Sequence, residues 1–138
     1  MEAIQVLEQA APLSYQEGYD NAGLLTGNSN WNCTGILCTL DATEQVIMEA
    51  KERRCNLVVA HHPIILGGLK KITGRNYVEK SVISAIKHDI AIYAIHTNLD
   101  HVLHGVNNRI ADRLGLASRL ILAPNDGQLI ERRNFVPF

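Results

Sequence analysis

The stretch Leu57–Pro63, with the sequence LVVAHHP, decides the fold. Its four apolar residues are too few for a buried helix and predict a short strand buried on both faces. Pro63 cannot continue a central strand, so the strand ends as it reaches two adjacent histidines. Neighbouring strand residues point to opposite faces, so both imidazoles reach one metal only at a strand end, and otherwise they serve two metals. At this point the alternative is a pair of structural histidines.

Helix and strand patterns alternate on both sides of this stretch. Apolar spacing predicts helices over residues 2–10, 42–53, 77–88 and 106–114. Continuous apolar runs predict strands over residues 35–40, 57–60, 90–95 and 119–122. We expect Asp41 to cap the second helix with Glu44 as its reciprocating partner, and Asn76 to cap the third. Residues 14–30 are predicted to be a turn-rich loop.

This alternation predicts an α/β fold with a mainly parallel sheet and helices on both faces, a three-layer αβα arrangement. In such sheets the ligand site lies beyond the carboxyl ends of the strands. Three successive predicted strands end at Asp41, at His61 and His62, and at His96 with Asp100 close behind. All the candidate ligands therefore gather at one edge of the sheet, which favours a metal site over structural histidines.

Length and composition place the chain among globular proteins, with one α/β metal-binding domain over residues 1–138. The net charge of −1 gives no reason to expect a nucleic-acid partner. No apolar run approaches a membrane span and no signal peptide opens the chain, so we expect a cytoplasmic protein. The odd number of cysteines suits a reducing compartment, and we expect Cys38 and Cys55 to be buried as small hydrophobic residues.

The candidate ligands combine imidazole nitrogen with carboxylate oxygen, a set that suits zinc, iron, manganese or nickel and disfavours calcium. An aspartate can bridge two cations, and paired cations about 3.5–4 Å apart activate water and stabilise both oxygens of a displacement. His96 would be a further ligand or would orient one, whereas His101 and His104 are expected to be surface or loop residues. Two histidines and one aspartate leave two cations short of ligands. The remainder would come from water, another subunit or a longer chain.

Three motifs resemble one known family. They are Tyr19–Leu24 (YDNAGL), Leu57–Pro63 (LVVAHHP) and His96–Asp100 (HTNLD), the last followed by Gly105-Val106-Asn107. They are similar to motifs of the Nif-three-like dinuclear metal-centre family, whose members are often named GTP cyclohydrolase I type 2 homologues. The loop over residues 68–77 also resembles bacterial members, and the similarity covers residues 4–124 in the right order.

The resemblance implies a set of site residues and an assembly. His61, His62 and Asp100 occupy the family's N-terminal metal-ligand positions, His96 faces the site, and Asp20 and Asn21 lie in the loop that lines it. The family completes its two-metal centre with a histidine and a glutamate near its C-terminus. We find no such segment here, so the chain resembles the N-terminal lobe of a larger fold and a fragment of a longer chain. The resemblance also implies ring-shaped hexamers, each a trimer of dimers.

Asp41, at the end of its predicted strand, is a further candidate for lining the site.

Two functions fit these residues. The first is a dinuclear metal-dependent hydrolase of a small nucleotide-like or phosphorylated substrate, and the second is a non-enzymatic protein for metal storage, delivery or regulation. The GTP cyclohydrolase label rests on the resemblance, because no residue in the sequence indicates guanine recognition. Lys70, Lys71 and Arg75 form either a solvated loop or a basic loop that attracts an anionic group. A metal-free domain with structural histidines is the third alternative.

Overall fold

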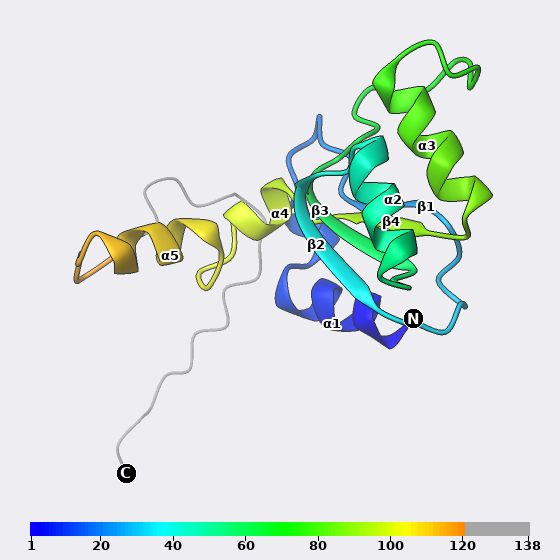
Figure 1. Ribbon diagram of the computed structural model, residues 1–138. Helices are drawn as coiled ribbons and strands as arrows, with labels where there is room; N and C mark the ends of the chain where they lie inside the picture. Colours follow the sequence, from blue (N-terminus) through cyan, green and yellow to red (C-terminus); the bar gives the residue numbers. More distant parts are fainter. Residues whose placement is uncertain (121–138) are drawn as a thin grey trace.

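The predicted strand that carries the two histidines lies inside a four-stranded sheet in the computed structural model, which describes residues 1–120 (Figure 1). The order is β1-β4-β3-β2, where β1 is Gly23–Thr26, β2 is Ile36–Asp41, β3 is Leu57–His62 and β4 is Ala91–Ala94. β2, β3 and β4 run parallel, and β1 pairs antiparallel with β4. The predicted α/β fold with a mainly parallel sheet is therefore confirmed.

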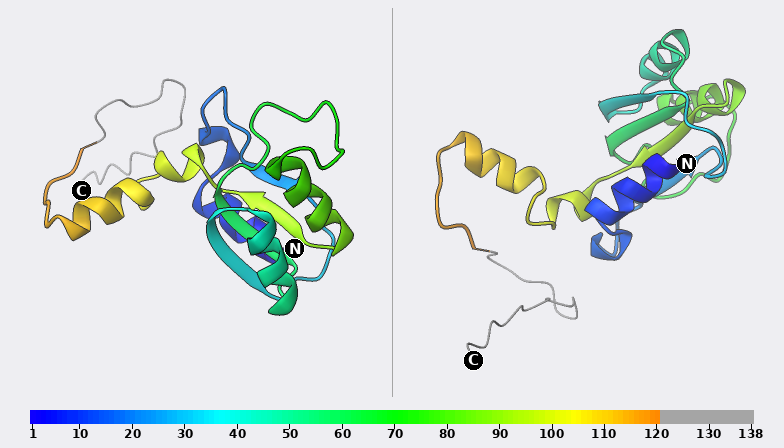
Figure 2. Two further views of the ribbon diagram at one scale, coloured as in Figure 1. Left: turned by 45° about the horizontal axis from the view of Figure 1, so that its top comes forward. Right: turned by 90° about the horizontal axis from the view of Figure 1, so that it is seen from below.

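Helices cover the sheet on both faces, as predicted (Figures 1 and 2). α2 (Glu44–Glu52) and α3 (Tyr77–Lys87) lie on one face, where Ile47 and Ala85 pack against Val58 and Ile92 of the strands. α1 (Glu2–Ala10) lies on the other face and buries Ile4 in a second apolar cluster. Three layers result, because each buried strand presents apolar side chains to both helical layers.

Three short elements connect these layers or extend from them: the 3-10 turn η1 (Leu13–Tyr15), the short helix α4 (Thr97–Asp100) and the helix α5 (Val106–Arg113). α4 follows directly beyond the carboxyl end of β4, and α5 extends away from the sheet (Figure 1). None of the helices in the described part of the chain is both long enough and apolar enough to span a bilayer.

One predicted helix cap is confirmed and the other is wrong. Asn76 caps α3, because its side chain accepts a hydrogen bond of 2.8 Å from the Glu79 backbone N–H. α2 is capped by Thr43, whose hydroxyl accepts from the Val46 N–H at 3.4 Å, and Glu44 is the first helical residue. Asp41 therefore does not cap this helix. It ends β2, and its carboxylate is free to contact the neighbouring strand end.

The structure differs from the predicted loop over residues 14–30, which contains the end of η1 and the whole of the strand β1. β1 is only four residues long and its pairing with β4 is irregular between Leu24 and Thr26, so it lacks the alternating pattern of a strand. Gly27, at φ +91°, lets the chain pass over β4: a Cβ there would lie 2.7 Å from the Ala91 Cβ. In the predicted strand 119–122, residues 119 and 120 are not in a strand, and 121–122 lie outside the described residues.

The expectation that Cys38 is buried is wrong, and Cys55 is only partly buried. Every second residue of β2 points to the same face of the sheet as α1. These residues are Ile36, Cys38 and Leu40. α1 lies over the middle of the sheet and leaves the edge strand β2 uncovered on that face (Figure 2). Cys38 is therefore exposed, and Leu40 is 58% exposed.

Candidate metal centre

Three histidines meet where β3 and β4 end. His61 and His62 are the last two residues of β3, and His96 is the N-cap of α4, two residues after the end of β4. One ring nitrogen from each lies within 4.8 Å of the other two. The ring centroids are 5.0 Å apart for His61–His62, 5.2 Å for His61–His96 and 5.6 Å for His62–His96. Strand pairing causes this convergence, since β3 and β4 are parallel neighbours that end at the same edge of the sheet.

Each of the three rings is oriented by a hydrogen bond at Nδ1. His61 Nδ1 lies 3.0 Å from the Ile95 carbonyl oxygen, and a carbonyl can only accept, so Nδ1 carries the proton. His62 Nδ1 lies 2.8 Å from Asp41 Oδ1, and His96 Nδ1 lies 2.9 Å from Asp20 Oδ1. An ionised carboxylate likewise only accepts. In the neutral rings, Nε2 of all three histidines therefore keeps its lone pair for a metal ion.

Asp20 is the most strongly held of these acceptors, and its side chain is fully buried. Oδ1 accepts from His96 Nδ1 and from the Asn21 N–H at 2.7 Å, and Oδ2 accepts from the backbone N–H and the hydroxyl of Thr97. Burial alone would raise the pKa of Asp20, but the hydrogen bonds from Thr97, His96 and Asn21 together hold the pKa below its ordinary value. Asp20 is therefore an anion at neutral pH.

The loops around the three histidines are fastened to distant parts of the chain. Asn98 is fully buried, donates to the Ala11 carbonyl oxygen at 2.7 Å and accepts from the His96 N–H at 2.9 Å. Asn21 donates to the Ile65 carbonyl oxygen at 2.6 Å, which joins the Asp20 loop to the segment after β3. The position of His96 is thus fixed by residues from the N-terminal part of the chain.

The cluster lies at the surface, with one side open to solvent. The His62 side chain is 46% exposed and that of His96 is 21% exposed, while Asp41 is 58% exposed. Metal ligands at this position are within reach of a small molecule from solvent.

Asp100, His101 and His104 do not belong to this group of three. Asp100 is the last residue of α4 and is not a member of the group of three, and its backbone carbonyl accepts from Asn107 Nδ2 at 3.0 Å. His104 is exposed, as expected. His101 is half-buried and bonds the Tyr15 carbonyl oxygen at 2.7 Å through Nδ1, so it joins α4 to η1 instead of lying free on the surface.

The donor set fits a transition-metal ion. Three imidazole nitrogens with an open side resemble the three protein ligands and one open position of catalytic zinc sites, and imidazole also suits iron and nickel. In such sites the ring nitrogen that does not bind the metal usually donates its N–H to a carboxylate or carbonyl oxygen, which orients the ring. Within residues 1–120, His61, His62 and His96 are the residues that could hold an ion in this way.

Comparisons with known proteins point to one family. The sequence model of the Duf34/NIF3 (NGG1p interacting factor 3) family matches residues 1–132. A GTP cyclohydrolase 1 type 2 homolog of Clostridium perfringens is 40% identical over 119 residues, which are 86% of this chain and 45% of the relative. The homolog of Bacillus subtilis is 41% identical over 121 residues, which are 88% of this chain and 32% of the relative.

Solved structures agree with this comparison. A Bacillus cereus protein related to NIF3 superposes with a TM-score of 0.84 at 40% identity, over 90% of this chain and 34% of that one. Reduced HcgD from Methanocaldococcus jannaschii superposes with a TM-score of 0.77 at 29% identity, over 84% of this chain and 46% of that one. The chain thus spans less than half the length of these relatives.

Proposed function

Because the chain belongs to the Duf34/NIF3 family, we propose that it carries the metal-binding part of a metal-dependent hydrolase. In this proposal His61, His62 and His96 hold a divalent transition-metal ion through Nε2. Asp100, on the short helix that His96 caps, is the proposed carboxylate ligand, and two ions fill the complete centre. The proposed metal is zinc, iron, manganese or nickel.

The observation that carries the proposal is that three separate hydrogen bonds direct three neighbouring rings. Ile95, Asp41 and Asp20 each accept from one Nδ1, so the three Nε2 atoms are the free nitrogens of a single cluster. Structural histidines would have no need for three independently fixed tautomers around one point. The arrangement is the one that metal-binding histidines require.

A divalent ion at this position would supply Lewis acidity for hydrolysis. The chain's own residues orient the ligands: Asp20 and Asp41 hold two of the rings, and the exposed side of His62 leaves access from solvent. The proposed substrate class is a small nucleotide-like or phosphorylated molecule. Support for this class comes from the names of the relatives, which are GTP cyclohydrolase 1 type 2 homologs.

The first experiment measures metal content. Purified protein is loaded with zinc, iron, manganese or nickel, desalted and analysed for bound metal per chain. We expect His62→Ala and Asp100→Ala to lower the metal content, while His104→Ala, an exposed histidine outside the cluster, leaves it unchanged. Unchanged metal in both site variants would refute the ligand assignment.

The second experiment tests hydrolysis. The metal-loaded protein is screened against nucleotides and phosphoesters, and product release is compared with that of the metal-free protein and of His62→Ala. Metal-dependent turnover that the variant lacks would support the hydrolase. Stoichiometric metal with no turnover on any substrate would contradict it, and would favour metal storage, delivery or a regulatory scaffold, which uses the same ligands.

The assembly and location are also proposals. We propose a cytoplasmic homo-oligomer, with the hexameric trimer of dimers as the expected form of the complete protein. Light scattering of the purified protein measures the mass, and a mass below that of a dimer would contradict a homo-oligomer.

A further inference from the structure

Thr97, the first residue of α4, is buried, and its hydroxyl has two partners from a distant part of the chain. Oγ1 accepts a hydrogen bond of 2.9 Å from the Glu17 backbone N–H and donates to Asp20 Oδ2. A backbone N–H can only donate and an ionised carboxylate can only accept, so the direction of both bonds is fixed. The hydroxyl proton of Thr97 therefore points at Asp20.

The same carboxylate holds the ring of His96. Asp20 Oδ1 accepts from His96 Nδ1 at 2.9 Å, while Oδ2 accepts from the Thr97 backbone N–H at 3.1 Å as well as from its hydroxyl. A carboxylate group is planar, so the bonds that hold Oδ2 also set the direction in which Oδ1 meets the ring. A directed series of bonds thus runs from the Glu17 N–H through Thr97 and Asp20 to His96.

The other two rings of the cluster do not depend on a buried carboxylate. His61 Nδ1 bonds a backbone carbonyl, and His62 Nδ1 bonds Asp41, whose side chain is 58% exposed. The side chain of Asp20 has no exposed surface. An exposed carboxylate can replace a lost donor with water, whereas a buried one must keep its protein donors or remain unsatisfied. Of the three rings, His96 is therefore the one whose support depends on a further side chain.

We propose that Thr97 is a positioning residue of the metal centre, because its hydroxyl holds Asp20 in the orientation that fixes His96. The inference rests on the proposed function, which assigns His96 Nε2 to the metal ion. The alternative is that Thr97 only fills space at the start of α4. The two roles use different parts of the side chain: positioning needs the hydroxyl, and packing needs the methyl group and the branched shape.

Two substitutions separate these roles. Thr97→Val keeps the branched shape and removes the hydroxyl, whereas Thr97→Ser keeps the hydroxyl and removes the methyl group. We expect Thr97→Val to lower zinc affinity about 5-fold, less than the roughly 10–100-fold for a group that bonds a metal ligand directly, and Thr97→Ser to retain the affinity. Isothermal titration measures both. A Thr97→Val variant that binds zinc as well as the unchanged chain would overturn the positioning role, and so would a Thr97→Ser variant that loses affinity.

A measurement on the metal-free chain separates this inference from the proposed function. Heteronuclear NMR reports which ring nitrogen of His96 carries the proton. We expect the Nδ1-protonated ring in the unchanged chain and in Thr97→Ser, and a smaller share of it in Thr97→Val. An unchanged chain that binds no zinc would refute the metal centre. An unchanged chain that binds zinc, with a His96 tautomer that Thr97→Val does not alter, would overturn the role of Thr97 alone.

Thr26 in β1 provides a matched control. It is also buried, and its hydroxyl also has two partners: it accepts from the Ile92 N–H at 3.1 Å and donates to the Ile90 carbonyl oxygen at 3.4 Å. Thr26→Val should leave zinc affinity and the His96 tautomer unchanged. An equal effect of both valine variants would overturn the inference. Circular dichroism checks folding, and if Thr97→Val does not fold, Thr97→Ser still decides between the two roles.

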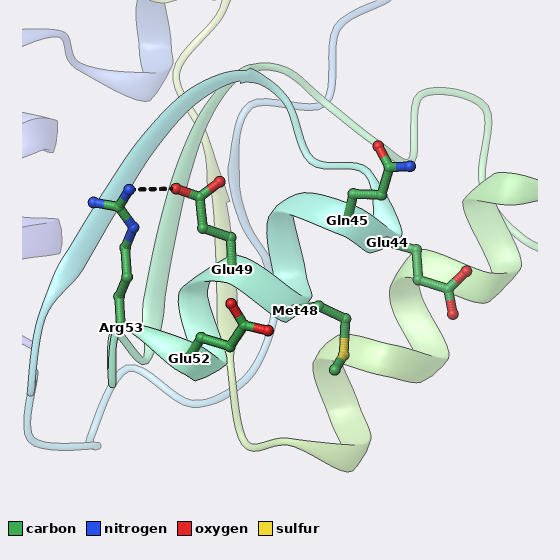
Figure 3. Close-up of a pocket in the computed structure, with 6 residues that line it drawn as sticks. All are labelled: Glu44, Gln45, Met48, Glu49, Glu52 and Arg53. Atoms are coloured by element: carbon green, nitrogen blue, oxygen red, sulfur yellow. Dashed lines mark ion pairs between the residues drawn. The ribbon is translucent and has the colours of Figure 1, made fainter.

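A double-mutant cycle tests whether Thr97 acts through Asp20. Asp20→Asn with Thr97→Val should lose no more zinc affinity than Asp20→Asn alone, since residues of one hydrogen-bond network are not additive. Glu49 is the reference carboxylate, because it lies on α2 and pairs with Arg53 at 2.8 Å (Figure 3). Glu49→Gln with Thr97→Val should lose as much affinity as Thr97→Val alone. Additive losses from Asp20→Asn and Thr97→Val would overturn the proposed path.

Discussion

The edge of the sheet with the histidines and the helix α5 are held in opposite ways. At the sheet edge, His96 bonds Asp20, 76 positions earlier, and Asn98 bonds Ala11, 87 positions earlier. At α5, Asn108 of the helix accepts from Arg119, which follows the helix and lies only 11 positions away. The fold itself therefore fixes the geometry of the histidines, whereas the hydrogen bonds between α5 and the described residues after it are local. Substitutions at the sheet edge should therefore change metal affinity, whereas substitutions in α5 should not.

The largest expected effect is on metal affinity at the sheet edge. His61→Ala removes one of three ring nitrogens, so we expect the affinity for zinc to fall by more than about 100-fold, beyond the usual effect of losing a ligand's hydrogen-bond partner. Isothermal titration with zinc measures this. The matched change on α5, Ile110→Ala, should leave the affinity within error of the unchanged chain. A similar loss in both variants would refute the independence of the two regions.

The second effect concerns the junction between the two regions. A Cβ at Gly105 would overlap the Leu99 carbonyl oxygen, so Gly105→Ala forces the turn between α4 and α5 apart. We expect a loss of about 2 kcal/mol in the free energy of unfolding, typical of overpacking. Urea denaturation measures it. Gly18→Ala is the control, because a Cβ at Gly18 has no atom within 4 Å, and an equal loss there would contradict the steric explanation.

A smaller effect is expected from the acceptor behind His96. Asp20→Asn keeps one acceptor oxygen of similar shape but removes the charge, so we expect zinc affinity to fall roughly 10-fold, the low end for such hydrogen-bond partners. Zinc titration at neutral pH measures the change. Glu17→Gln, a nearby carboxylate that contacts His101 instead of the cluster, should not alter the affinity. An unchanged affinity in Asp20→Asn would show that Asp20 does not orient a ligand.

The smallest effect is a pH dependence in the body of the fold. The Glu79 carboxylate accepts from the N–H groups of Arg75 at 3.0 Å and Thr73 at 2.8 Å, and these bonds hold its pKa below the ordinary 4.5. Its stabilising contribution is complete above pH 4.5 and is lost as pH falls through the lower folded pKa. In Glu79→Gln, acid should destabilise the fold less steeply. Denaturation at several pH values tests this, and identical pH profiles would contradict it.

The architecture could be predicted from the sequence because buried strands and helix starts are marked by short local patterns of residues. The LVVA run of β3 and the apolar residues before His96 show the buried parallel strands directly, and Asn76 shows the start of α3. The shared edge of His61, His62 and His96 follows from this alternation. The same local evidence misassigned the cap of α2, since Asp41 and Thr43 are both good capping residues and only backbone geometry selects Thr43.

Other features depend on contacts that no local pattern shows. The bond between Asp20 and His96 joins residues 76 positions apart, so the sequence indicated both as candidate site residues without indicating that they are in contact. β1 exists because β4 offers an edge to pair with, and its irregular register hides it from periodicity. The exposure of Cys38 depends on where α1 ends its cover of the sheet, which the apolar run of β2 does not reveal.

The bond from His61 Nδ1 to the Ile95 carbonyl has one more consequence. It holds the imidazole in one orientation, so little rotational entropy would remain to be lost if His61 binds an ion as proposed. Immobilising a free side chain costs about 0.5–1.5 kcal/mol. In the proposed metal centre, a side chain that folding has already oriented would keep the same position whether or not a cation is bound.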